Sequence, residues 1–318
     1  MSEKNAANEA RLILLHALTP VHVGTGQAVA NVDLPIAREK ATGYPIIPAS
    51  AFKGVLRDYF KFVKQQPDSW LIRAFGSEPP RSEQASSTET APQLESGDWA
   101  FTDLRILCLP VRSFYGTFAY VTCPLVLKRL LQVAKALGVK APFSETVPDV
   151  KDTKIVLANQ DTLGREGKVY LEELDLEVGE NGDVGKIAKD LARCLFGSST
   201  DEQGESSEPN SQSKLAEQEM FTQRFAIVSN QIFDYLSETA TEIAARVRLD
   251  DNVKTVISGA LWYEEAVPAE SIFYGFVTHV KPAGHQVPLN QLDSQMLVQI
   301  GGDATIGRGI CKVVIVHE

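Results

Sequence analysis

Apolar residues follow two different spacings along the chain, and together these predict a mixture of strands and helices. Continuous or alternating apolar runs favour strands, whereas apolar residues three and four apart favour helices. The predicted strands are residues 12–18, 99–109, 154–158, 225–229, 243–249, 254–263, 271–281 and 310–316, and the predicted helices are residues 50–63, 124–137, 185–196 and 232–240. This order, with a hairpin about the sequence LDDN, predicts an α+β fold with a largely antiparallel sheet.

Two polar stretches interrupt the pattern. Residues 77–97 and 197–218 are rich in Ser, Glu, Gln and Pro and contain few large apolar side chains. Such segments bury too little apolar surface to offset the entropy that is lost on ordering. We therefore expect one domain over residues 1–318 that carries two flexible acidic insertions.

The predicted helix 50–63 has an apolar face. Phe52, Val55, Leu56 and Val63 recur at helical spacing, together with Tyr59, and should point into the core. Ser50 follows Pro48, so its hydroxyl is expected to cap the start of this helix.

Basic residues line another side of the same helix. Lys53, Arg57, Lys61 and Lys64 recur at intervals of four, four and three. Beside a helix N-terminus, whose free N–H groups attract anions, such a strip suits RNA phosphates. An ordinary solvated face has the same spacing and is the alternative.

Two glycine-rich loops stand near the ends of the chain. Gly24 and Gly26 follow the first predicted strand in TPVHVGTGQ, and the loop IGGDATIGRG, residues 300–309, precedes the last strand. The second loop contains Gly301, Gly302 and Arg308. Glycine lets backbone N–H groups approach a phosphate closely, although either loop by itself is also typical of a simple turn. Neither matches a P-loop or a dinucleotide-binding pattern, so a nucleotide-dependent enzyme has little support.

The net charge of −10 is the opposite of what nucleic-acid binding usually requires. Between Arg11 and Arg73, however, eight basic residues stand against four acidic ones. Screening over about 8–10 Å means that a phosphate responds to this local field.

The four cysteines are widely spaced, which argues against a zinc site and fits a reducing cytoplasm. Apolar runs fall well short of the roughly 20 residues that span a bilayer, so we expect no membrane partner.

Several motifs, taken in order, resemble one family. TPVHVGTGQ, VDLPIARE, TGYPIIPASAFKGVLR and GGDATIGRG are similar to segments of the repeat-associated mysterious protein (RAMP) superfamily of CRISPR systems. VDLPI, ALWYEEAVP and the helix residues Ser50, Lys53, Gly54 and Arg57 resemble, more specifically, the backbone subunit of the type III-B (Cmr) effector complex. The resemblance extends over residues 12–316.

The resemblance implies an RRM-like (ferredoxin-like) core with insertions. It also implies that copies of the chain stack along a CRISPR RNA guide, together with other subunits of the complex. The hairpin at residues 243–263 would be a protruding thumb that pushes between the guide and a single-stranded target RNA; a hairpin that only extends the sheet is the alternative. The residues expected to contact RNA are Ser50, Lys53, Arg57, Arg38, Arg246, Arg248, Gly301, Gly302 and Arg308.

The same resemblance implies endoribonuclease activity, with Asp33 of VDLPI as the residue that cuts the target. Asp33 would either hold a divalent metal ion, Mg²⁺ or Mn²⁺, at the scissile phosphate or help to deprotonate the ribose 2′-hydroxyl. His22 could orient the phosphate or donate a proton. Glu264 and Glu265 match a family position near the cleavage site, while Ala266 stands where many relatives have an aromatic residue immediately after this acidic pair. From the residues alone, Asp33 would be a loop cap and His22 a packed loop histidine.

Two other functions stay open at this point. A non-catalytic subunit could hold the guide without cutting, and a stand-alone RAMP nuclease could process the CRISPR precursor transcript. Asp33 argues against the first, and the VDLPI segment with its predicted hairpin argues against the second.

Overall fold

The computed structural model describes residues 9–24, 32–78, 94–151, 153–180, 182–197, 209–250, 256–280 and 286–316. Within these residues twelve strands form one mixed sheet in the order β13-β14-β1-β12-β4-β5-β9-β6-β8-β7, with β2 beside β4 and β3 beside β12. The strands of this sheet are β1 (Ala10–Ala17), β2 (Ile46–Ile47), β3 (Trp99–Phe101), β4 (Leu104–Arg112), β5 (Phe118–Thr122), β6 (Lys154–Leu157), β7 (Lys168–Leu171), β8 (Leu174–Val178), β9 (Phe225–Val228), β12 (Ile272–His279), β13 (Gln295–Gln299) and β14 (Ile310–Val316). Among the strand pairs of the described residues, only β5–β9 and β6–β8 are parallel. Together with the helices below, this sheet confirms the mixed α and β character expected from the sequence.

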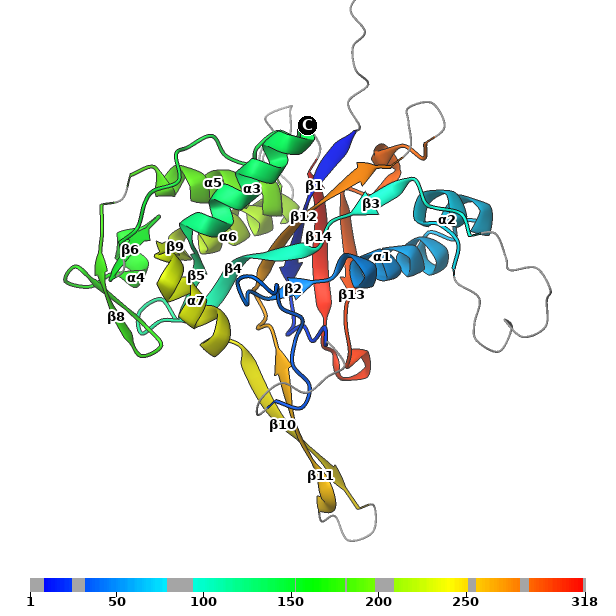
Figure 1. Ribbon diagram of the computed structural model, residues 1–318. Coiled ribbons are helices and arrows are strands. Elements are labelled where there is room, and N and C mark those ends of the chain that lie inside the picture. The colour runs from blue at the N-terminus through cyan, green and yellow to red at the C-terminus, as the bar shows by residue number, and fades with distance from the viewer. Residues whose placement is uncertain are drawn as a thin grey trace, which may run out of the picture.

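Helices pack at both ends of this sheet (Figure 1). The helices are α1 (Ala49–Asp58), α2 (Asp68–Phe75), α3 (Pro124–Leu137), α4 (Gln160–Leu163), α5 (Val184–Phe196), α6 (Pro209–Arg224) and α7 (Asn230–Thr239), with 3₁₀ turns η2 (Leu289–Gln291) and η3 (Ala304–Ile306). Figure 1 shows α3, α5, α6 and α7 gathered around β5, β6 and β9, and α1 and α2 at the opposite end. Among the helices that the structure describes, none has the length and apolarity needed to cross a membrane.

The central strand β1 pairs antiparallel with both β12 and β14. Its residues Leu12 to Leu15 are fully buried, because the strand is covered on both faces. The antiparallel registers pair His16 with Ile272 of β12 and Ala17 with Cys311 of β14. The segments that follow β1 and precede β12 and β14 therefore emerge from the sheet at the same edge.

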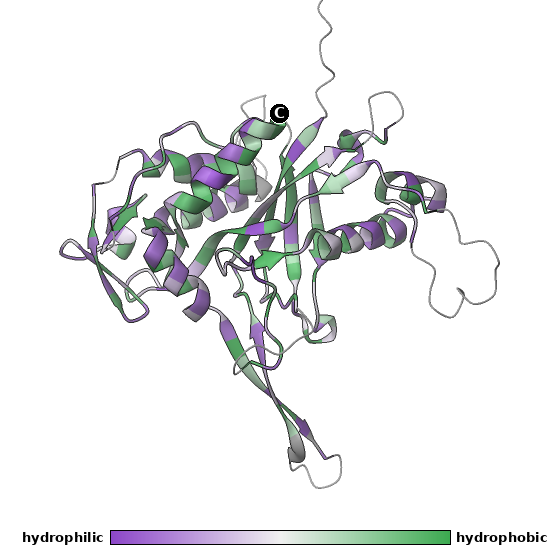
Figure 2. Ribbon diagram, in the orientation of Figure 1, coloured by the Kyte–Doolittle hydropathy of each residue, from purple (hydrophilic) through white to green (hydrophobic). Residues whose placement is uncertain are grey.

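One of these segments is a hairpin that projects from the body of the molecule (Figure 1). Strands β10 (Glu242–Leu249) and β11 (Val256–Ala266) pair antiparallel, with Ala245 opposite Tyr263 and Arg246 opposite Trp262. Because side chains alternate along a strand, Arg246 points to one face of the hairpin. Ile243, Val247, Leu261 and Tyr263 point to the other and are 42–58% exposed. Figure 2 shows the apolar residues on these arms, which lie outside the main core.

The predicted elements agree with the structure in most places, and the differences have local causes. The predicted strand 99–109 is two strands, β3 and β4, interrupted at Thr102 and Asp103. Helix α6 occupies the second half of the expected insertion 197–218, and its Phe221 is fully buried against the core. The remaining parts of the expected insertions, residues 79–93 and 198–208, lie outside the described residues.

The end of the first helix departs from regular α-helical geometry. Phe52 and Leu56 are buried as predicted, but residues Tyr59–Val63 form a π-helical turn, η1, in which the Lys64 N–H donates to the Tyr59 carbonyl at 3.2 Å. A π-turn places more residues in one turn, so the apolar stripe shifts. Phe60 is buried, whereas Val63 is 64% exposed, and the prediction that Val63 faces the core is wrong.

The prediction that Ser50 caps this helix is also wrong. The helix begins at Ala49, and no side chain of its N-cap residue Pro48 makes a capping bond. Instead the Ala49 N–H donates to the Asp103 carboxylate at 2.8 Å. The acceptor therefore comes from the turn between β3 and β4, which sequence spacing could not indicate.

Asp103→Ala should lower the free energy of unfolding by about 1 kcal/mol, because it removes the carboxylate that accepts from the helix N-terminus. The matched control is Ser50→Ala, which should leave stability unchanged because Ser50 is exposed in the first helical turn. Urea denaturation of the three proteins measures both. Equal losses, or a larger loss for Ser50→Ala, would contradict the capping assignment.

Candidate active site at the base of the hairpin

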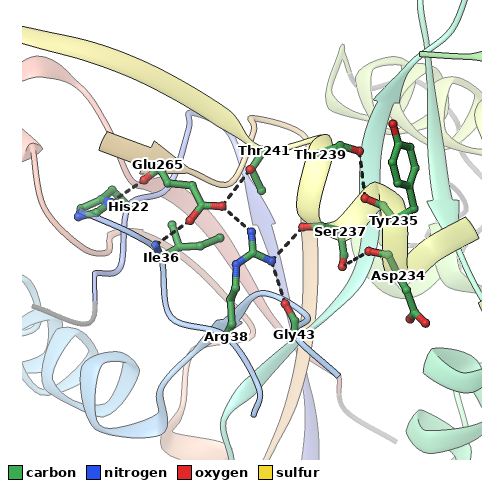
Figure 3. Close-up of polar contacts among 10 residues, drawn as sticks. All are labelled: His22, Ile36, Arg38, Gly43, Asp234, Tyr235, Ser237, Thr239, Thr241 and Glu265. Atoms are coloured by element: carbon green, nitrogen blue, oxygen red, sulfur yellow. Dashed lines mark hydrogen bonds and ion pairs between the residues drawn. The ribbon is translucent and has the colours of Figure 1, made fainter. Parts of the chain in front are cut away.

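His22 lies at the edge of the sheet where three segments meet. It follows β1, and its ring Nδ1 is 2.6 Å from the carbonyl oxygen of Glu265 on β11 (Figure 3). A carbonyl can only accept, so Nδ1 carries the proton in this contact. In the neutral ring, Nε2 is then the basic nitrogen. His22 is thus fixed to the hairpin base in a defined tautomer.

The late glycine loop packs directly against the backbone of His22. The Gly302 N–H donates to the His22 carbonyl oxygen at 2.9 Å. Gly301 has φ +88°, and a Cβ there would lie 2.0 Å from the same oxygen. Only glycine fits at position 301, so this loop supports the His22 backbone in addition to any contact with RNA. Gly24 lies next to the His22 ring, while Gly26 is outside the described residues.

Asp33 lies on the outer edge of β11. The segment that carries it runs alongside the strand: the Leu34 N–H donates to the Tyr263 carbonyl at 3.1 Å, and the Glu265 N–H donates to the Leu34 carbonyl at 3.0 Å. The Asp33 side chain is exposed, and its Oδ2 accepts from the Tyr263 N–H at 2.8 Å. His22 and Asp33 therefore attach to β11 two residues apart, about 7 Å along the strand.

Glu264 is buried between two arginines. It is 4% exposed, with Arg246 Nε 3.4 Å from its Oε2 and Arg308 Nε 3.8 Å from its Oε1. Arg246 also lies 3.3 Å from Asp303 of the glycine loop. The charged face of the hairpin is thereby joined to the glycine loop, and Glu264 and Asp303 together balance the two guanidinium groups.

Glu265 points to the other side of β11 and contacts the Asp33 segment (Figure 3). It is 5% exposed. Its carboxylate accepts from the Ile36 N–H at 3.1 Å and the Thr241 hydroxyl at 2.9 Å, and it forms an ion pair with Arg38. Arg38 is among the residues expected to contact RNA, but here its guanidinium is engaged within the protein.

The structure thus brings together most of the residues expected to be functional. Eight of them meet where the hairpin leaves the body: His22, Asp33, Arg38, Arg246, Glu264, Gly301, Gly302 and Arg308. Asp303, Thr241 and Glu265 join them there, and Ala266 beside them is fully buried. The sequence pattern did not single out Asp303 or Thr241, since a polar residue in a loop is common. Their tertiary partners are what make them part of the site.

The predicted contacts on α1 lie in a separate pocket. Ser50 and Lys53 line a cavity of about 370 Å³ together with Gly76 and Trp99. Burial, with the neighbouring Arg57 charge, lowers the pKa of Lys53, which a bound phosphate would oppose. Arg57 instead donates to the Gly76 carbonyl at 2.5 Å and to Glu78 at 2.9 Å. Arg248 is exposed on the hairpin.

A divalent metal ion would find a limited set of ligands here. Among the described residues no group of three His, Cys, Asp or Glu side chains lies close enough together to hold a metal. The two arginines beside Glu264 disfavour a cation at that carboxylate. Asp33 is exposed, so it fits a metal held by one carboxylate with RNA phosphate oxygens and water, which Mg²⁺ accepts.

Comparison with known proteins agrees with this geometry. The family model described as the RAMP superfamily matches residues 14–312, so the chain belongs to the RAMP superfamily and the family resemblance is confirmed. The chain is 34% identical to the CRISPR system Cmr endoribonuclease Cmr4 of Pyrococcus furiosus, over 96% of both chains. It is 22% identical to the CRISPR system CMR subunit Cmr4 of Saccharolobus solfataricus, over 94% of both.

Solved structures give the same result for the fold. A crystal structure of oligomeric Cmr4 from Pyrococcus furiosus superposes with a TM-score of 0.67 at 28% identity, covering 96% of this chain and 98% of that one. A chain of the type III-B Cmr-beta complex bound to cognate target RNA superposes with a TM-score of 0.66 at 21% identity, covering 97% and 98%.

The different contacts of Lys53 and Arg57 can be tested with a matched pair of variants. Lys53→Gln should weaken RNA binding and reduce the salt dependence by about 0.7 in the log–log slope for one lost phosphate contact. Arg57→Gln should instead lower the free energy of unfolding by about 1–2 kcal/mol, since its hydrogen bonds are internal. RNA titration at several salt concentrations, with urea denaturation of each variant, separates the two effects. If Arg57→Gln changed the salt-dependence slope and Lys53→Gln did not, the assignment of Lys53 to RNA binding and Arg57 to stability would be wrong.

Proposed function

We propose that this chain is the repeated backbone subunit of a type III-B CRISPR effector complex, which holds a guide RNA in stacked copies and cuts the paired target RNA. The observation that carries the proposal is the position of Asp33. Its carboxylate is exposed at the base of a projecting hairpin, on the same strand to which His22 is bound. The 34% identical relative is named an endoribonuclease.

The hairpin is proposed to act as the thumb of this subunit. Its exposed apolar face can pack against unstacked bases, and its other face carries Arg246 and Arg248 for the backbone. Arg308 Nη1 is buried with no acceptor among the described residues. A phosphate oxygen could satisfy this donor only if neighbouring side chains moved to expose it.

The finer description of the fold belongs to the same proposal. An RRM-like core is supported by four neighbouring antiparallel strands in the order β14-β1-β12-β4. Helix α1 follows β1, which is the first of these strands along the chain. The hairpin, β5 to β9 and the helices around them would then be insertions between β4 and β12. This arrangement leaves the loops at one end of the core free to meet RNA.

The residues present suit attack by the ribose 2′-hydroxyl on the adjacent phosphate. The 2′-oxygen forms a bond to phosphorus and the bond to the 5′-oxygen breaks, which gives a 2′,3′-cyclic phosphate and a 5′-hydroxyl. Asp33, which is exposed, would accept the 2′-hydroxyl proton, and His22 would orient the phosphate or, in its doubly protonated form, donate the Nε2 proton to the leaving oxygen. A divalent ion, when bound at Asp33, would supply neutralisation of the charge that develops on the phosphate.

Asp33→Asn tests the chemical role directly. Asn keeps the oxygen that accepts from the Tyr263 N–H but removes the negative charge, so assembled complexes should still bind guide and target. Cleavage should fall by about 10²–10⁴-fold at every repeated position. End-labelled target RNA on a sequencing gel measures this. Asp175→Asn, an exposed carboxylate on β8, is the matched control and should cut normally. Full periodic cleavage by the Asp33 variant would refute the assignment.

Stacking along a guide predicts that assembly depends on RNA length. Mass measured by light scattering after size exclusion should rise in steps as the guide is lengthened, because each added segment accommodates one more copy. The same protein without RNA provides the baseline. A single unchanging mass at every guide length would exclude stacking, even where RNA binds.

A further inference from the structure

Glu265 makes more connections between separate segments than the other residues of the site. Through its side chain it contacts the Ile36 N–H, Arg38 and Thr241. Through its backbone it accepts from His22 and donates to Leu34. One residue of β11 therefore fixes both the histidine segment and the segment that carries Asp33 (Figure 3).

Arg38 extends these connections to the start of the hairpin. Its Nη1 donates to the Gly43 carbonyl at 2.8 Å and the Ser237 carbonyl at 2.9 Å, while Nη2 pairs with Glu265. Ser237 belongs to the last turn of α7, which leads through Thr241 into β10. The planar guanidinium, with its fixed donors, suits a junction of this kind better than a lysine would.

We infer that Glu265 and Arg38 are a positioning pair that fixes Asp33 relative to both arms of the hairpin. The inference rests on the proposed function, since it concerns the reaction assigned to Asp33. In this arrangement the hairpin cannot shift without moving the Asp33 segment. Cleavage is thereby tied to the position that the hairpin takes when RNA is bound.

Two features separate this role from RNA binding and from general support of the fold. Arg38 is 24% exposed at its side chain and directs three of its five N–H donors to acceptors within the protein. The chain just after Arg38 is anchored independently: Glu39 accepts from Arg129 at 2.7 Å and Thr42 at 2.7 Å. Although burial acts the other way, these hydrogen bonds lower the pKa of Glu39. A change at Glu265 should therefore loosen residues 32–38 and leave the sheet intact.

The test uses assembled complexes carrying Glu265→Gln, Arg38→Gln or both. Glu265→Gln keeps an oxygen for the Ile36 N–H but loses the ion pair, so the cleavage rate constant at saturating target should fall roughly 10- to 100-fold, as for other residues that orient an active group. The half-saturating target concentration and the salt dependence of guide binding should not change. The double variant should be no slower than the slower single variant, because both singles break the same contact.

Controls distinguish this inference from the proposed function. Glu242→Gln removes an exposed carboxylate of the same hairpin and should cut normally, while Asp33→Asn defines the loss of chemistry. Amide hydrogen exchange should quicken over residues 32–38 in Glu265→Gln but not in β1 or β12. The double variant is needed because the single change leaves the Arg38 charge without its partner.

The positioning role would be overturned if Glu265→Gln and the double variant cut normally while Asp33→Asn is inactive. The proposed catalytic role of Asp33 would then be unaffected. A drop of about 0.7 in the salt slope for Arg38→Gln would overturn it in favour of a phosphate contact. Exchange that quickened throughout the sheet would overturn it in favour of general stability. Normal cutting by Asp33→Asn would instead contradict the proposed function.

Discussion

The antiparallel pairing of β1 with β12 and β14 is the constraint on which the site depends. Since β1 runs between them, the end of β1 and the starts of its two neighbours lie at one edge of the sheet. The histidine segment follows β1, the hairpin precedes β12, and the glycine loop precedes β14. Residues near positions 22, 264 and 301 are therefore neighbours although they are far apart in sequence.

Ion pairing explains how arginine side chains are held at a site that contains even more carboxylates than arginines. Arg246 and Arg308 lie beside the buried Glu264, and Asp303 reaches Arg246 from the glycine loop. A guanidinium has five donors in a fixed plane, so pairing on one side can leave other N–H groups for a phosphate. The internal carboxylates hold the arginines in place, and in the proposed function this order would reduce the entropy that RNA binding costs.

The elements that the sequence predicted are present in the structure, but several others, among them α2, α6 and β13, were not predicted. Pro124–Leu137 matches its prediction because an amphipathic pattern, Pro at the first position and Gly138 after the last all agree. The short strands β7 and β8 were not predicted, because four or five residues give too little periodicity. Val63 was misplaced because a π-turn changes the spacing that the pattern assumes.

In the candidate site, too, some residues could be predicted from the sequence and others could not. The family motifs led to Asp33, His22 and Glu264, because the resemblance supplied their roles. The engagement of Arg38 and Arg57 inside the protein could not be read from spacing, since a basic strip looks the same whether its partners are phosphates or carbonyl oxygens. Only the tertiary contacts with Ser237 and Gly76 distinguish the two.

In the proposed function, every stacked copy supplies one cutting site through its own Asp33. Complexes assembled from mixtures of wild-type and Asp33→Asn chains test it most directly, with the product ladder quantified at each position. We expect all rungs to weaken in proportion to the fraction of Asn chains while their spacing stays constant. A ladder that keeps its full intensity with Asn chains alone, or that loses only one rung at every mixing ratio, would contradict it.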